Sequence, residues 1–295
     1  MKVAISTDTN SSIAREEIRE AGLYILPMPV NIEGRTYLEG VDVDSAQLYD
    51  AMRQHKAVST SQPSPGQLME LWDGILAEGY DEVVHIPMSS GLSGSCENAM
   101  QLSAAYGGRV QVVDNHRISV TQRESALSAL VLARQGANAR EIKARLEQSA
   151  YDASIYIMVD SLEYLKRGGR ITPAVAALAT VLHLKPVLTI QGDKLDVYAK
   201  SRGTAMAEKR MLEAIRKDRL TRFASVSDSK LQIDVAGTLE SDEQVQRWLQ
   251  LVQAEFPEMR IAYVHLPCSI ACHVGVNAAG IAITKTTVQS GCFFR

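Results

Sequence analysis

The first half of the chain alternates short apolar runs with helix-like segments, and this alternation constrains the fold more than any other feature. Residues 83–86 and 110–113 are apolar runs of strand length, and segments with helical spacing of apolar residues lie between and beside them. Strands that alternate with helices form parallel sheets with right-handed crossovers. We therefore expect an N-terminal α/β domain, residues 1–160, built on a parallel sheet.

The elements of this domain follow from local signals. The predicted strands are residues 3–5, 23–32, 83–86, 110–113 and 155–159. The predicted helices are residues 13–21, 95–106 and 118–134, with three more that are capped by Asp44, Ser64 and Asn138. Each of these three residues is followed three positions later by Gln or Glu, which is the pattern of a capping box.

Residues 161–295 predict a C-terminal α+β domain. Asp160 and Glu163 are expected to cap a short helix whose basic end, residues 166–170, carries Gly168 as the left-handed terminating residue. The apolar stretch 174–184 predicts a helix that is buried or lines an apolar cavity. The remaining predictions are a hairpin at 187–199, helices at 205–217 and 241–255, and strands at 223–226, 261–264 and 281–284.

Charge and hydropathy exclude several classes of function. A net charge of -3 without a basic stripe argues against a nucleic-acid binder. The longest apolar run, 174–184, is shorter than the roughly 20 residues that span a bilayer, so we expect no transmembrane segment. The first residues lack the pattern of a signal peptide, and four cysteines make no disulfide framework in a chain of 295 residues. A cytoplasmic protein is the expectation.

Two hydroxyl-rich, uncharged segments, residues 59–66 and 89–95, are the strongest functional signal. Each lies beside a predicted strand or helix of the α/β pattern, where ligands usually bind. Small hydroxyls and glycine amides can hold an anion without a metal ion or a fixed positive charge. The sequence therefore predicts a site for a carboxylate or phosphate head group.

Four segments together resemble the DegV family of bacterial fatty-acid-binding proteins, some of which are the binding subunit of fatty acid kinase. They are residues 60–66, 89–94, 162–171 and 184–188, in the order of the family's motifs. The resemblance implies two α/β domains with a long-chain fatty acid buried between them. It implies a non-catalytic protein that uses no metal or cofactor, binds the fatty acid as its ligand and presents the carboxylate to an ATP-dependent fatty acid kinase.

The resemblance also assigns residues. It implies that Thr60, Ser93, Gly94 and His273 bind the carboxylate, with Ser61 and Asn277 as secondary contacts. Arg170 and Arg202 are expected on exposed turns of the face that docks a kinase. Two departures stand out: His273 is followed by Val274-Gly275-Val276-Asn277 where the family usually has Gly-Pro-Gly, and Asp8 is followed by threonine instead of serine.

Other interpretations stay open. Thr60 and Ser61 could form an ordinary turn before a helix. Residues 91–95 nearly match a nucleophile elbow, with Ser95 in place of the last glycine, so a serine hydrolase or esterase using Ser93 is the main alternative. A regulator that responds to a lipid, sugar or phosphate is another. The spacing of four residues hints at zinc, although it fits no standard module: His265, Cys268, Cys272 and His273.

Overall fold

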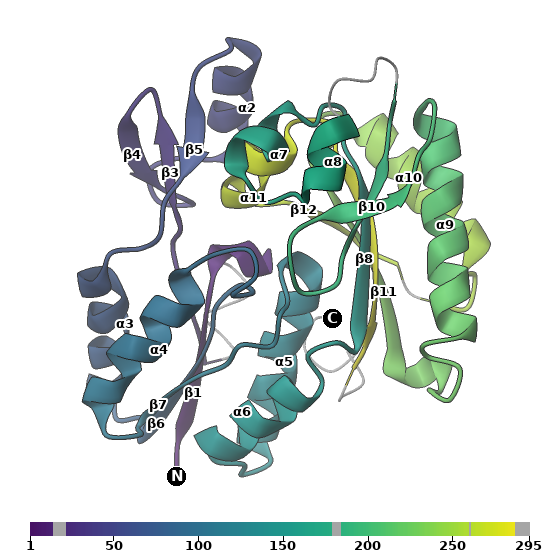
Figure 1. The fold of residues 1–295 in the computed structure, drawn as a ribbon. Helices are drawn as coiled ribbons and strands as arrows, with labels where there is room; N and C mark the ends of the chain where they lie inside the picture. The colour runs from purple at the N-terminus through teal and green to yellow at the C-terminus, as the bar shows by residue number, and fades with distance from the viewer. Residues whose placement is uncertain (14–21, 179–183, 260, 287–295) are drawn as a thin grey trace. The chain divides into compact units, whose positions relative to one another are not determined.

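A computed structural model describes residues 1–13, 22–178, 184–259 and 261–286 (Figure 1). Most of the predicted helix 13–21, the later part of the apolar stretch 174–184 and Cys292 lie outside these residues. The chain forms two compact units. Unit 1 comprises Met1–Tyr151 with Pro267–Ser269, and unit 2 comprises Asp152–Leu266 with Ile270–Arg295.

Unit 1 is built on the predicted parallel sheet. Its four strands, in the spatial order β2-β1-β6-β7, are Leu23–Leu26, Val3–Asp8, Glu82–Ile86 and Val110–Val112. Every pair of neighbours in this sheet is parallel. The carboxyl ends of β1 and β6 therefore meet at one edge of the sheet, where ligands bind in folds of this kind.

Helices of unit 1 begin at the predicted caps. Capping boxes form at Asp44, Ser64 and Asn138, and they open α2 (Ser45–Arg53), α3 (Pro65–Ala77) and α6 (Ala139–Gln148). Among the described residues of unit 1, the other α-helices are α4 (Ser95–Ser103) and α5 (Ser119–Arg134). Trp72 of α3 is fully buried in a core that includes residues of β1, β6 and α4, which fixes α3 and α4 against the sheet.

The predicted extended segment 23–32 forms two strands in two different sheets. β2 ends at Leu26, and β3 (Pro29–Ile32) joins a separate antiparallel sheet with β4 (Arg35–Leu38) and β5 (Val58–Thr60). This second sheet has the order β4-β3-β5 and carries Thr60 at the end of β5. Proline at 27 and 29 explains the break, because proline cannot donate to a strand ladder.

Unit 2 contains a six-stranded mixed sheet. In the order β10-β9-β8-β13-β11-β12, its strands are Asp196–Ala199, Val187–Ile190, Ala153–Met158, Ala279–Lys285, Leu231–Gly237 and Tyr263–His265. The predicted hairpin is confirmed as β9 and β10. α9 (Thr204–Leu220) and α10 (Asp242–Glu255) pack their apolar residues on one face of the sheet (Figure 1).

Several predictions for the second half are corrected. β8 pairs antiparallel with β9 and β13, so it belongs to unit 2 and the division between the units falls after Tyr151 instead of residue 160. β11 was not predicted, whereas the predicted strand 223–226 is a turn. Asp160 does not cap the following helix, because its carboxylate pairs with Lys185.

The remaining helices of unit 2 are short. α7 (Glu163–Gly168) and α8 (Pro173–Leu178) follow β8, and α11 (Cys268–Val274) precedes β13. The first two residues of α11 belong to unit 1, where Glu39 accepts hydrogen bonds from the Ser269 hydroxyl at 2.8 Å and backbone N–H at 3.3 Å. Within the described ranges, no helix combines the length and apolar character needed to cross a membrane.

Candidate functional site

The two hydroxyl-rich segments form two loops of unit 1. The first loop, residues 61–64, runs from the end of β5 to the cap of α3, and the second loop, residues 87–94, runs from β6 to α4. Thr60 is the last residue of β5 and pairs with Val30, which fixes its backbone. Thr60 and Ser93 are half-buried, whereas Ser61 and Gly94 are exposed.

The two loops meet at Gly94. A Cβ atom placed on Gly94 would lie 2.7 Å from Nε2 of Gln62, so the Gln62 side chain lies directly against this glycine. The contact joins the loop that follows Thr60 to the loop that ends at Ser93 and Gly94. The sequence predicted both loops but gave no sign of Gln62 as the residue that joins them.

Hydrogen bonds from neighbouring elements fix the second loop. Met88 N–H donates to Asp8 at 3.0 Å, Ser89 N–H donates to the carbonyl of Arg117 at 2.8 Å, and Ser90 N–H donates to Asp114 at 3.3 Å. Within the loop, the N–H of Ser93 donates to the Ser89 carbonyl at 3.1 Å. The shape of the loop is therefore set before any ligand arrives.

The carboxylate of Asp8, at the end of β1, helps to hold the second loop in place. The residue is 2% exposed, and its carboxylate accepts hydrogen bonds from Met88 N–H, Asn10 N–H and the Gln122 amide, each at 3.0 Å. No lysine or arginine of the described residues pairs with it, and burial raises its pKa to about 6. Asp8 is thus an anion held by N–H groups alone at neutral pH, and it ties the end of β1 to the second loop.

Ser93 and Gly94 lie at the start of α4, where hydrogen-bond donors are available. The Ser93 oxygen accepts a hydrogen bond from Ser95 N–H at 3.2 Å, which leaves the hydroxyl hydrogen available to donate. Gly94 is the N-cap residue and has no side chain that could cap the helix. The Ser95 hydroxyl is buried without a partner among the described residues. Free N–H groups and the helix dipole favour an anion at such a helix start.

The geometry around Ser93 differs from that of a serine hydrolase. In a nucleophile elbow the serine stands on a sharp turn from strand to helix, whereas residues 87–92 separate β6 from Ser93. In unit 1, His85 hydrogen-bonds to Ser6 at 2.9 Å, and burial lowers its pKa to about 3. Among the described residues, no histidine hydrogen-bonds to Ser93, so nothing described activates it as a nucleophile.

His273 lies near the end of α11 in unit 2, against α7. A Cβ atom on Gly168 would lie 2.3 Å from Nδ1 of His273, so the imidazole occupies the space that a side chain at 168 would need. Burial and the charge of Arg170 lower the pKa of His273 to about 4. The imidazole is therefore neutral at physiological pH and can donate one N–H.

The predictions for Arg170, Arg202 and the glycine pair 168–169 hold only in part. Arg170 is half-buried and donates to the Gly168 carbonyl, which corrects its predicted exposure, whereas Arg202 is exposed as predicted. The left-handed residue that ends α7 is Gly169, with φ 69°, and not Gly168. Gly168 is required for the close approach of His273.

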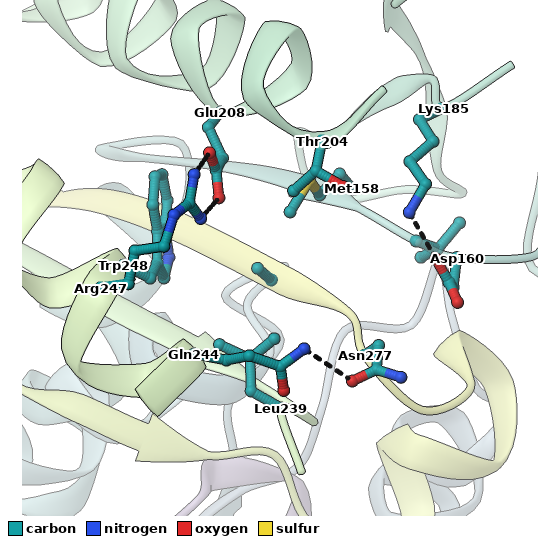
Figure 2. Close-up of a pocket in the computed structure, with 12 residues that line it drawn as sticks. Met158, Asp160, Lys185, Thr204, Glu208, Leu239, Gln244, Arg247, Trp248 and Asn277 are labelled. Carbon is teal, nitrogen blue, oxygen red and sulfur yellow. Dashed lines mark hydrogen bonds and ion pairs between the residues drawn. The ribbon is translucent and has the colours of Figure 1, made fainter. Parts of the chain in front are cut away.

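Asn277 lies on a polar cavity of about 190 Å³ in unit 2 (Figure 2). Its side chain accepts a hydrogen bond from Gln244 and donates one to Glu240, both at 3.5 Å. The charged groups of the cavity are already paired: Lys185 with Asp160, and Arg247 with Glu208 at 2.6 and 2.7 Å (Figure 2). Such a lining is unsuited to an acyl chain.

The spacing of His265, Cys268, Cys272 and His273 suggested zinc, but the described residues form no metal site. No group of three or more histidine, cysteine or acidic side chains there could hold a metal ion. Cys268 and Cys272 are both buried on α11, and His265 lies on β12.

The fold defines the class of this chain as a two-unit α/β protein with a parallel sheet in its N-terminal unit. A family model described as "Uncharacterised protein, DegV family" matches residues 2–286. A DegV domain-containing protein of Deinococcus radiodurans is 31% identical over 284 residues, which are 96% of this chain and 98% of that protein. The chain belongs to the DegV family.

Solved structures agree with this assignment. A fatty-acid-binding DegV family protein from Thermus thermophilus matches with a TM-score of 0.86 and 28% identity, covering 97% of this chain and all of that one. DegV of Bacillus subtilis, a fatty acid binding protein, matches with a TM-score of 0.84 and 26% identity over the same share of each chain. The predicted fold and family are confirmed.

The packing of His273 on Gly168 generates the first prediction. In Gly168→Ala the new methyl group must displace the imidazole, and we expect the pKa of His273 to rise from about 4 toward 6.5, because burial is the main cause of its low value. NMR titration of the histidine ring signals measures this shift.

Gly74→Ala is the matched control, since Gly74 also lies in a helix but has open space around its Cα. A His273 pKa that stays near 4 in Gly168→Ala would contradict the packing described here.

Proposed function

We propose that this protein binds a long-chain fatty acid and holds its carboxylate with Thr60, Ser93 and the backbone amide of Gly94. His273 of unit 2 is proposed as a further donor, and Ser61 as a secondary contact. The observation that carries the proposal is the meeting of two hydroxyl-rich loops at the start of α4, where the N-cap residue is a glycine. Relatives at 26–28% identity that bind fatty acids support the choice of ligand.

Uncharged donors suit this ligand. Ser93 has a hydroxyl hydrogen to give, the start of α4 offers backbone N–H groups, and the neutral imidazole of His273 adds a donor without a positive charge. Asn277 fits the role less well, because its amide is already bonded to Gln244 and Glu240. We therefore leave Asn277 out of the proposed contacts.

The acyl tail and the carboxylate of the ligand make different contributions to the binding free energy. At about 0.8 kcal/mol per buried methylene, a chain of roughly 16 carbons gains on the order of 11–12 kcal/mol. Association costs of roughly 4–15 kcal/mol offset much of this gain. Hydrogen bonds to a charged head group add roughly 1.5–3 kcal/mol each. The tail therefore sets the affinity, and the loops set the orientation of the carboxylate.

The second prediction tests the head-group contacts. Thr60→Ala and Ser93→Ala should each weaken fatty-acid binding roughly tenfold, because each removes a donor to a desolvated carboxylate. Folding should stay intact, since Thr60 ends an edge strand and Ser93 lies on a loop. The double variant should lose less than the product of the single effects, because both hydroxyls act on one anion. Isothermal titration calorimetry measures all three.

Ser59→Ala is the control, because this exposed neighbour in β5 points to the opposite face of the strand from Thr60. Unchanged affinity in both single variants would remove the loops from the proposed site. Labelling of Ser93 by a fluorophosphonate would support the hydrolase alternative instead.

We further propose that the protein is not catalytic by itself and presents the bound carboxylate to a separate ATP-dependent kinase in the cytoplasm. Arg202 supports this idea, because it is exposed just before α9 and an arginine fork suits phosphate and carboxylate groups on a partner. Arg170 is less suited, since it lies against Gly168 and lowers the pKa of His273. A lipid-responsive regulator is the alternative if no kinase acts on the complex.

The third prediction separates presentation from binding. Arg202→Ala should bind fatty acid normally yet support little acyl-phosphate formation with a cognate kinase and ATP. Arg210→Ala, which removes another exposed arginine of unit 2, should keep full turnover. The assays need a fixed ionic strength, because exposed charges are screened by salt. Full turnover by Arg202→Ala would place the docking face elsewhere.

A further inference from the structure

The backbone of Gly94 gives no reason for a glycine at this position. Its φ of -70° and ψ of 0° lie in the right-handed helical region, which any residue can adopt. The reason is space: a Cβ atom there would lie 2.7 Å from Nε2 and 3.7 Å from Cδ of Gln62. The missing side chain thus makes room for the carboxamide of Gln62.

Gln62 is held at this place by its neighbours in the chain. The following residue is the buried Pro63, and a residue before proline is restricted to extended backbone. On the other side, Ser61 N–H donates to the Pro29 carbonyl at 3.3 Å, which ties the chain to β3. Gln62 is exposed, and its carboxamide makes no hydrogen bond to any of the described residues. By contrast, Gln67 uses its amide to close the cap of α3.

We propose that Gln62 is a further head-group contact, donating from Nε2 to the ligand carboxylate beside the Gly94 amide. This inference rests on the proposed function, and it adds a residue to the same site. An amide suits the role because it brings N–H donors without a charge. Gly94 then has two roles. Its N–H donates to the ligand, and its lack of a side chain lets the Gln62 carboxamide approach.

A double-mutant cycle tests this arrangement with palmitate as the probe. Gln62→Ala should weaken binding about five- to tenfold by removing a donor. Gly94→Ala keeps the backbone amide but displaces the flexible end of Gln62, so we expect a similar loss. The double variant should bind no more weakly than Gln62→Ala alone, because its methyl group has nothing to displace. Calorimetry on the four proteins gives the comparison.

Charge provides an independent arm of the test. Gln62→Glu keeps the shape but places a carboxylate beside the head group, so it should weaken palmitate binding more strongly than Gln62→Ala. It should leave binding of methyl palmitate unchanged relative to Gln62→Ala, because the ester carries no charge to repel. Gln101→Glu, an equal charge change at an exposed position of α4, should leave both ligands unaffected.

The outcomes distinguish the two proposals. Unchanged palmitate affinity in Gln62→Ala, or fully additive losses in the cycle, overturns the role of Gln62 while fatty-acid binding by the wild type stands. Equal losses of palmitate and methyl palmitate in Gln62→Glu also overturn it, since charge would then not matter. Absence of palmitate binding by the wild-type protein overturns the proposed function and this inference with it.

Discussion

The hydrogen bonds to the buried carboxylate of Asp8 are the constraint on which the candidate site depends. Through Met88 N–H and the Gln122 amide, Asp8 ties the end of β1 to α5 and to the second loop. Burying this carboxylate without a cationic partner is unfavourable, as its raised pKa shows. The benefit is a loop whose hydroxyl and amide donors are already in place when an anion arrives, so binding needs little further ordering.

The donors that we propose for the carboxylate carry no fixed positive charge, and this has a chemical advantage. Neutral donors can hold a carboxylate while leaving its oxygens available to react, whereas a tight arginine pair would occupy both oxygens. In unit 2 the same principle applies to His273, because its burial against Gly168 and its proximity to Arg170 keep the imidazole neutral. Arg170 acts there through the pKa of its neighbour.

Local signals in the sequence predicted much of the fold. The capping boxes at Asp44 and Ser64 formed as predicted, since both partners of each box lie within four residues. The alternation of strands and helices correctly predicted the parallel sheet of unit 1. Sheet membership in the second half could not be predicted in this way. β8 has the same apolar character as a parallel strand, and only its pairing with β9 and β13, more than 25 residues away, assigns it to unit 2.

For the candidate site, too, local features could be predicted from the sequence, whereas contacts between distant segments could not. The hydroxyl-rich loops were evident from composition, but the contact of Gln62 with Gly94 and that of His273 with Gly168 join residues 32 and 105 positions apart. Both glycines were interpreted from their immediate neighbours in the sequence. The structure instead explains each one by a side chain that packs against it from a distant segment, which no local pattern can reveal.

Native mass spectrometry of the purified protein tests the central claim most directly. We predict that the protein carries a mass increment of one long-chain fatty acid, which is released on denaturation. Delipidated protein should regain thermal stability when the fatty acid is returned. Protein that is ligand-free as purified and gains no thermal stability from fatty acids of 16 or 18 carbons would contradict the account.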